Sequence, residues 1–86
     1  MSQPRAIGTV IHYWTNLGVA GVELTDTLSL DSWVHFFGAT TDLQQRVTSM
    51  QHNHQFITQA HAGQQVGIRV ADRVRKGDTL FLLEDG

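Results

Sequence analysis

The chain has 86 residues, no cysteine and a formal net charge of −2. This length accommodates one domain with a single hydrophobic core, and the lack of cysteine excludes disulfides, zinc–thiolate sites and cysteine nucleophiles. The slightly acidic balance also argues against strong nonspecific binding of nucleic acid by the surface as a whole.

Short runs of β-branched and aromatic residues, separated by turn-forming residues, predict a series of strands. After a loose tail over residues 1–5, one domain is expected over residues 6–86. The strands are expected, in chain order, over residues 7–14, 19–24, 33–37, 43–50, 65–70 and 79–83. Segment 51–58 has no clear period, and the charged connection 71–78 has room for one short helical turn.

Because no window of a dozen residues has the helical period of 3.6, the predicted fold class is all-β. Six or seven short strands at this spacing are typical of a small antiparallel barrel, closed or nearly closed. Closure has a physical reason, since strands this apolar would be prone to aggregate along open edges.

The segment 33–37 carries large side chains on both faces of its predicted strand. If Val34 and Phe36 fill the interior, then Trp33, His35 and Phe37 point outward. Such a patch is a candidate interface, whether for a protein partner, for a second copy of the chain or for stacked bases. The alternative is that segment 51–58 or the C-terminal segment covers these rings.

Four of the six lysine and arginine residues fall within residues 69–76. Clustered cations can contact phosphates, so this segment is a candidate RNA-binding site. The alternative is a solvated turn that Asp72 and Asp78 partly neutralise. The candidate RNA-binding residues are Arg69, Arg73, Arg75 and Lys76.

The histidines at positions 52 and 54 would share one face of a strand, a geometry that can chelate a metal. Their segment offers no carboxylate to complete a ligand set, so we expect no metal site and a structural hydrogen bond from the His54 ring. Neither His12 with Asp26 or Asp31, nor Ser49 with His54, has the context of a catalytic centre. We therefore expect no catalytic residues, no cofactor and no enzymatic activity.

Taken together, several short motifs give the chain a resemblance to a known family. From about residue 7 to residue 83 it resembles stand-alone translation elongation factor-like proteins, whose barrel is related to the second domain of elongation factor Tu and to the C-terminal domain of collagenase-like peptidases. One departure is Asp31-Ser32, where relatives usually have Gly-Asp. The matching motifs are Gly8-Thr-Val-Ile-His-Tyr13, Leu17-Gly-Val-Ala20, Val22-Glu-Leu24, Gly38-Ala-Thr-Thr-Asp42, Val47 with Ser49-Met-Gln51 and His54, Ala62-Gly63, Val66-Gly-Ile68 and Arg75-Lys-Gly-Asp78.

The resemblance implies a six- or seven-stranded Greek-key barrel that binds another molecule rather than catalysing a reaction. The expected function is an adaptor that binds tRNA or a ribosomal element. The alternative is a protein-interaction module that acts in trans with a collagenase-like peptidase-type enzyme or as a homodimer. No phosphate-binding glycine loop occurs, so this chain does not itself hydrolyse GTP. Without a basic-then-apolar leader or a membrane-length apolar run, we expect a cytoplasmic protein that makes no membrane contact.

Overall fold

The computed structural model describes residues 4–83, which form ten strands and no helix. It contains no helix long and apolar enough to span a membrane within these residues. The all-β prediction is confirmed. The strands are β1 (Arg5–Trp14), β2 (Val19–Leu24), β3 (Leu28–Ser29), β4 (Trp33–Phe37), β5 (Asp42–Arg46), β6 (Met50–His52), β7 (Gln55–Phe56), β8 (Gln59–Ala60), β9 (Gln65–Arg69) and β10 (Thr79–Leu83).

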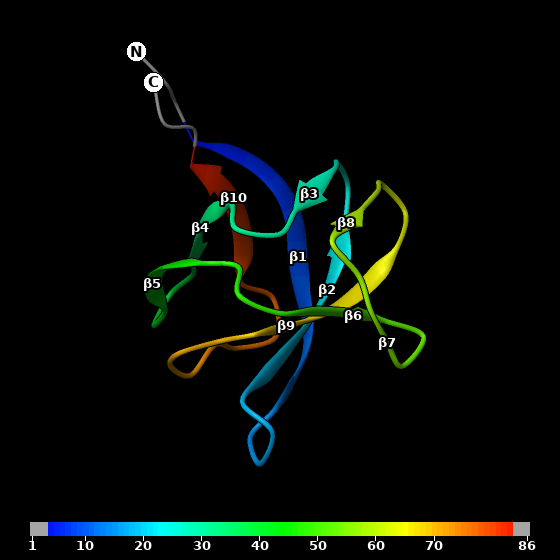
Figure 1. Ribbon diagram of the computed structural model, residues 1–86. Helices are drawn as coiled ribbons and strands as arrows, with labels where there is room; N and C mark the ends of the chain where they lie inside the picture. Colours follow the sequence, from blue (N-terminus) through cyan, green and yellow to red (C-terminus); the bar gives the residue numbers. More distant parts are fainter. Residues whose placement is uncertain (1–3, 84–86) are drawn as a thin grey trace.

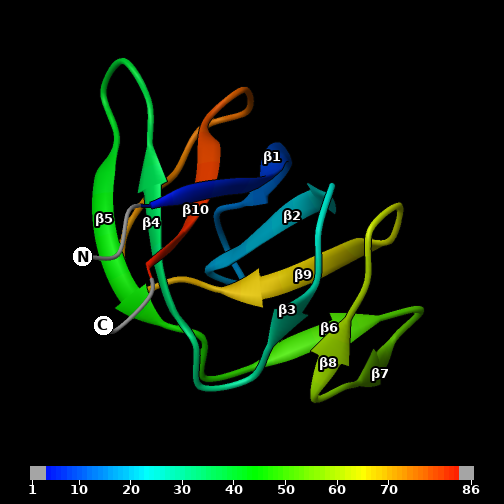
Figure 2. The same cartoon turned by 90° about the horizontal axis from the view of Figure 1, so that it is seen from above.

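Eight of the strands form one antiparallel sheet in the order β5-β4-β10-β1-β2-β9-β6-β7, and β3 pairs with β8 separately. The sheet curls strongly around the core (Figures 1 and 2). The sequence predicted a closed or nearly closed barrel of six or seven strands. Full closure is wrong, because within residues 4–83 no ladder joins the end strands β5 and β7. The additional strands, β3, β7 and β8, have only two residues each and leave little trace in the sequence.

The expected strand 43–50 is divided between the two ends of this sheet order. Its first part, β5, pairs with β4, whereas Met50 in β6 pairs with Ile68 in β9. Between them Val47 is fully buried, and its N–H donates to the carbonyl of Ser32 at 2.8 Å. The Gln45 side chain bridges from β5 to the chain that follows β9. This segment therefore curves around the core, because its successive parts bond to β4 and β9, which β10, β1 and β2 separate in the sheet order.

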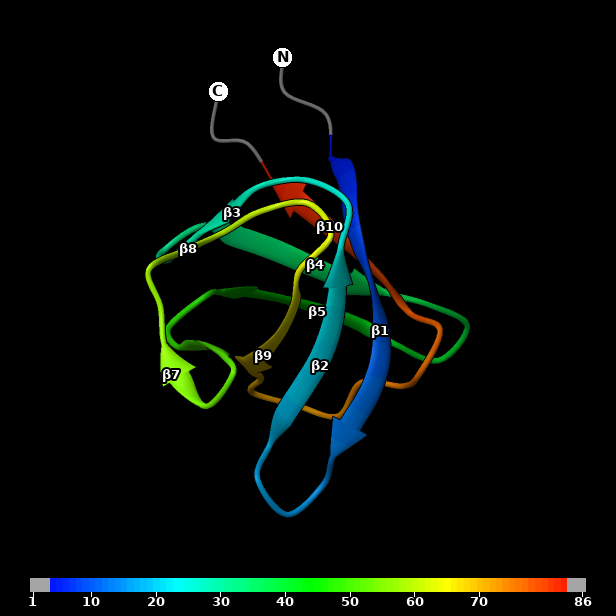
Figure 3. The ribbon, with the colours of Figure 1, turned by 90° about the vertical axis from the view of Figure 1, so that its right-hand side faces the viewer.

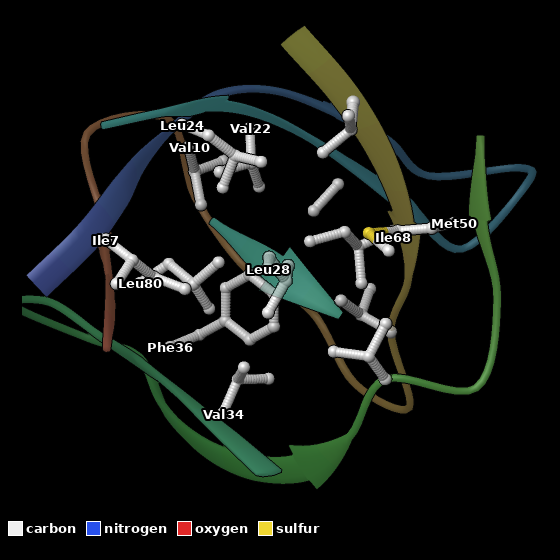
Figure 4. Close-up of a cluster of buried hydrophobic side chains, with 14 of the residues drawn as sticks. Ile7, Val10, Val22, Leu24, Leu28, Val34, Phe36, Met50, Ile68 and Leu80 are labelled. Carbon is white, nitrogen blue, oxygen red and sulfur yellow. The ribbon is translucent and has the colours of Figure 1, made fainter. Parts of the chain in front are cut away.

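The hydrophobic core is built from the alternate residues that point to the concave face of the sheet. Val34 and Phe36 from β4 are fully buried, as the alternation predicted, and the Phe36 ring lies among side chains from several strands (Figure 4). The small pair β3–β8 adds Leu28 and Ala60 to this cluster. Side chains thus fill the interior, and the outward residues are the ones left to contact other molecules.

Several turns use backbone conformations with positive φ. Gly18 (φ 65°) is the last residue of the turn in the β1–β2 hairpin, and this hairpin projects beyond the rest of the sheet (Figure 3). Asp31 has φ 68°, a conformation that glycine adopts more readily, and it stands at the position where the family resemblance implies glycine. The connection 71–78 contains turns and bends but no helical turn, contrary to the expectation. The predicted tail lies largely outside the described residues, and β1 begins at Arg5.

Candidate functional site

Strand β4 presents an aromatic surface to solvent. Trp33 is 39% exposed and Phe37 is 49% exposed, so neither segment 51–58 nor the end of β10 covers them. His35, between them, is half-buried, with its ring centroid 5.4 Å from that of Phe37. The three residues that were predicted to point outward therefore share one face.

The neighbouring strand β10 adds a residue that the sequence interpretation missed. Phe81 pairs with His35 across the β4–β10 ladder, and the two ring centroids lie 6.4 Å apart. Period-two alternation along residues 79–83 was the available signal, because the buried Leu80 implies that Phe81 points outward. We call Trp33, His35, Phe37 and Phe81 the β4 aromatic face.

Strand β5 supplies the polar rim of this face. The His35 Nε2–H donates to Asp42 Oδ1 at 2.6 Å, which fixes the orientation of the imidazole. Arg46 places its guanidinium carbon 5.3 Å from the Trp33 ring centroid, within the range of a cation–π interaction. A hydrophobic centre with a charged rim is the usual composition of a protein-binding patch.

The basic residues divide into two groups. Arg73, Arg75 and Lys76, which we call the basic loop, line a groove of about 450 Å³ together with His12 and Tyr13. Arg69 lies instead on β9, where it pairs with Val19 of β2. The structure thus brings three of the four candidate RNA-binding residues together.

The basic loop also adjoins the β4 aromatic face. A second groove, of about 350 Å³, is lined by Asp42, Arg73 and Arg75 together with Thr40, Thr41, Leu43 and Asp72. Because Asp42 also binds His35, the two candidate surfaces meet at this carboxylate.

The two histidines of segment 51–58 do not form the arrangement considered from the sequence. His52 donates from Nδ1 to the Gln65 carbonyl at 2.9 Å, whereas His54 lies exposed in the turn with φ 64°. The structural hydrogen bond was therefore assigned to the wrong histidine, because β6 ends at His52 and His54 already lies in the turn that follows. Within residues 4–83 no three metal-binding side chains cluster.

The pairs weighed as catalytic centres have other contacts. The His12 ring packs against Trp14 at a centroid distance of 4.4 Å. Asp26 forms an ion pair with Arg5 at 3.3 Å. His12 and Asp26 are thus each engaged with a different neighbouring side chain.

Comparison with known proteins connects the chain with peptidases. No protein-family model matches it. Over 80 residues, 92% of the chain, it is 34% identical to the uncharacterized protease MJ0090 of Methanocaldococcus jannaschii. It spans only 20% of the length of that protease.

Solved structures show the same fold. The C-terminal domain of the Geobacillus thermoleovorans "putative U32 peptidase" aligns with a TM-score of 0.85 and 20% identity, over 94% of this chain and 93% of that one. Its selenomethionine variant aligns with a TM-score of 0.84 at the same identity. The chain therefore has the fold of that C-terminal domain and is similar in sequence to part of a protease. The relation to elongation factor Tu stays a prediction.

Proposed function

We propose that this chain is a noncatalytic protein-interaction domain that docks on the catalytic part of a peptidase of the collagenase-like type. The β4 aromatic face carries the proposal, since Trp33 and Phe37 remain 39% and 49% exposed on a well-packed domain. The protease similarity and the shared fold with a peptidase C-terminal domain support the choice of partner. In the other form of this proposal, two copies of the chain associate with each other through the β4 aromatic face.

The chemistry of the β4 aromatic face suits a protein partner. Tryptophan and arginine are enriched among interface residues that contribute most to affinity, and Arg46 lies beside Trp33. Covering both rings removes apolar surface from water, while Arg46 and Asp42 remain at the rim for polar contacts. Truncating Trp33 should therefore weaken binding by about 2 kcal/mol or more, roughly a 30-fold loss of affinity.

Calorimetric titration of the chain against protease MJ0090 lacking its matching segment tests this docking. We expect saturable binding that Trp33→Ala and Phe37→Ala each weaken. Trp14→Ala is the matched control, because Trp14 is 43% exposed on another part of the surface. Equal losses for Trp33→Ala and Trp14→Ala would refute the assignment of this face. Sedimentation of the chain alone measures self-association, which Trp33→Ala should also reduce.

RNA binding is a second candidate function, favoured by the groove that Arg73, Arg75 and Lys76 line together. In this form the domain would be an adaptor for tRNA or a ribosomal element, with a translation-factor-type Greek-key barrel. Filter binding with bulk tRNA tests it, and affinity should fall as salt rises because bound counterions are released. Indifference to the charge reversals Arg73→Glu and Arg75→Glu would count against this function.

A further inference from the structure

The hairpin of β1 and β2 places the Trp14 indole over Gly21 on the outer face of the sheet. A Cβ built on Gly21 would lie 3.0 and 3.1 Å from Cζ3 and Cη2 of Trp14, so glycine lets the ring lie slightly closer to the backbone than alanine would. The His12 ring packs edge-on against the indole, with an interplanar angle of 62°. Trp14 is thereby fixed on two sides while 43% of it stays exposed.

Cationic side chains lie on both sides of this ring. Val19 pairs with Trp14 on one side and with Arg69 on the other, so all three leave the same face of the sheet. Two strand spacings, roughly 10 Å, separate Trp14 from Arg69. In the other direction, His12 contacts Trp14 and also lines the groove of the basic loop.

Few carboxylates oppose these cations. Asp78 is only 5% exposed and accepts a hydrogen bond from the Arg75 N–H at 2.7 Å, so it faces the interior of its turn. Asp72 is exposed, and its Oδ1 accepts from the Arg73 N–H at 2.7 Å. Glu23 is also exposed on the outer face of β2, two residues beyond Gly21. The four cations Arg69, Arg73, Arg75 and Lys76 therefore outnumber these three carboxylates, although the whole chain is acidic.

We propose that Trp14, Arg69 and the basic loop form a binding site for single-stranded nucleic acid. One base stacks on the outward face of the indole, and the flanking phosphates contact Arg69 and the basic loop. A fixed aromatic ring between cations suits a single strand, because base faces are accessible there and hidden in a duplex. This inference rests on the second candidate function and adds the contact that would recognise the ligand.

The two tryptophans of the chain make this contact measurable. With excitation selective for tryptophan over Tyr13, only Trp14 fluoresces in Trp33→Phe and only Trp33 fluoresces in Trp14→Phe. We expect a single-stranded RNA dodecamer to quench the first variant saturably and to leave the second unchanged. Anisotropy of the labelled dodecamer should show that Trp14→Ala weakens binding about 5- to 100-fold, the loss expected for one base stack, whereas Trp33→Ala has little effect.

The controls separate this inference from the RNA-binding function. Gly21→Ala keeps the indole but forces it to shift slightly away from the sheet, so it should weaken binding modestly in a chain that still melts cooperatively. A DNA dodecamer of the same sequence tests whether the strand must be RNA, and quenching by either strand supports the site. Anisotropy without Trp14 quenching, or a duplex bound as tightly as a single strand, would overturn the stacking site alone. No binding to any RNA would overturn the second candidate function as well.

Discussion

Gly38 follows β4 and lies against the Asp78 side chain, so replacing it with alanine tests how the two turns fit together. A Cβ at position 38 would overlap Asp78 Oδ1 and lie 2.8 Å from Cγ. The φ angle of Gly38 is not in the left-handed region, so alanine meets this steric obstacle and no backbone penalty. The carboxylate must therefore move.

Moving the carboxylate breaks the hydrogen bond that Asp78 Oδ2 accepts from the Arg75 N–H at 2.7 Å. A hydrogen bond to a charged acceptor contributes about 1.5–3 kcal/mol, and a misfitting methyl group costs about 1–3 kcal/mol. These terms overlap, because the displaced side chain relieves part of the clash. We expect Gly38→Ala to lower the free energy of unfolding by about 2–4 kcal/mol, a large part of the stability of a small domain.

Urea unfolding followed by circular dichroism measures this change, with Gly67→Ala as the control. At position 67 an added Cβ meets only Val19 Cγ1, at 3.1 Å, so the loss should stay below about 1 kcal/mol. In the Asp78→Ala background, Gly38→Ala should cost far less, because the obstructing carboxylate is gone. If instead the two substitutions add independently, the contact with Asp78 does not explain the effect of Gly38→Ala.

Two further predictions concern the conformation of turns and the attachment of β5. His54→Gly should raise the melting temperature by about 2–8 °C, because His54 has φ 64° and glycine adopts that conformation without strain. Conversely, Gly63→Ala should lower the melting temperature, because Gly63 has φ 88°. A His54→Gly variant that melts at a lower temperature than the unaltered chain would contradict this reasoning. Gln45→Ala removes a donor to the Arg69 carbonyl and an acceptor from the Ala71 N–H, both at 2.8 Å, so it should cost about 1–3 kcal/mol. Hydrogen exchange at Ala71 should then accelerate, and unchanged protection there would show that the bridge does not hold this segment.

The long strands could be predicted from the sequence because local patterns specify them. The expected ranges 19–24, 33–37 and 79–83 coincide with β2, β4 and β10. In β4, strict alternation of inward and outward residues also gave the correct faces for Val34, Phe36 and the exposed aromatic rings. Such patterns arise because neighbouring positions on a strand face opposite environments.

Features that depend on distant contacts left weaker signals. The break between β5 and β6 occurs because the two parts bond to strands that lie far apart in the chain, and nothing local encodes this. The pair β3–β8 joins residues about thirty positions apart, Leu28 with Ala60 and Ser29 with Gln59. Likewise, Gly38 and Asp78 belong to separate motifs, and only the folded chain shows that one leaves space for the other.

The division between inward and outward residues has a consequence for function. Core side chains such as Phe36 and Leu80 are fully buried, so the fold obtains its apolar burial without the outward rings. Trp14, Trp33 and Phe37 keep 43%, 39% and 49% of their surface in water, where large apolar groups contribute least to stability. Substituting them should change binding more than folding, whereas substituting Phe36 should do the reverse. The outer surface of this curled sheet can therefore be altered one site at a time, which allows the β4 aromatic face and the Trp14 site to be assigned separately.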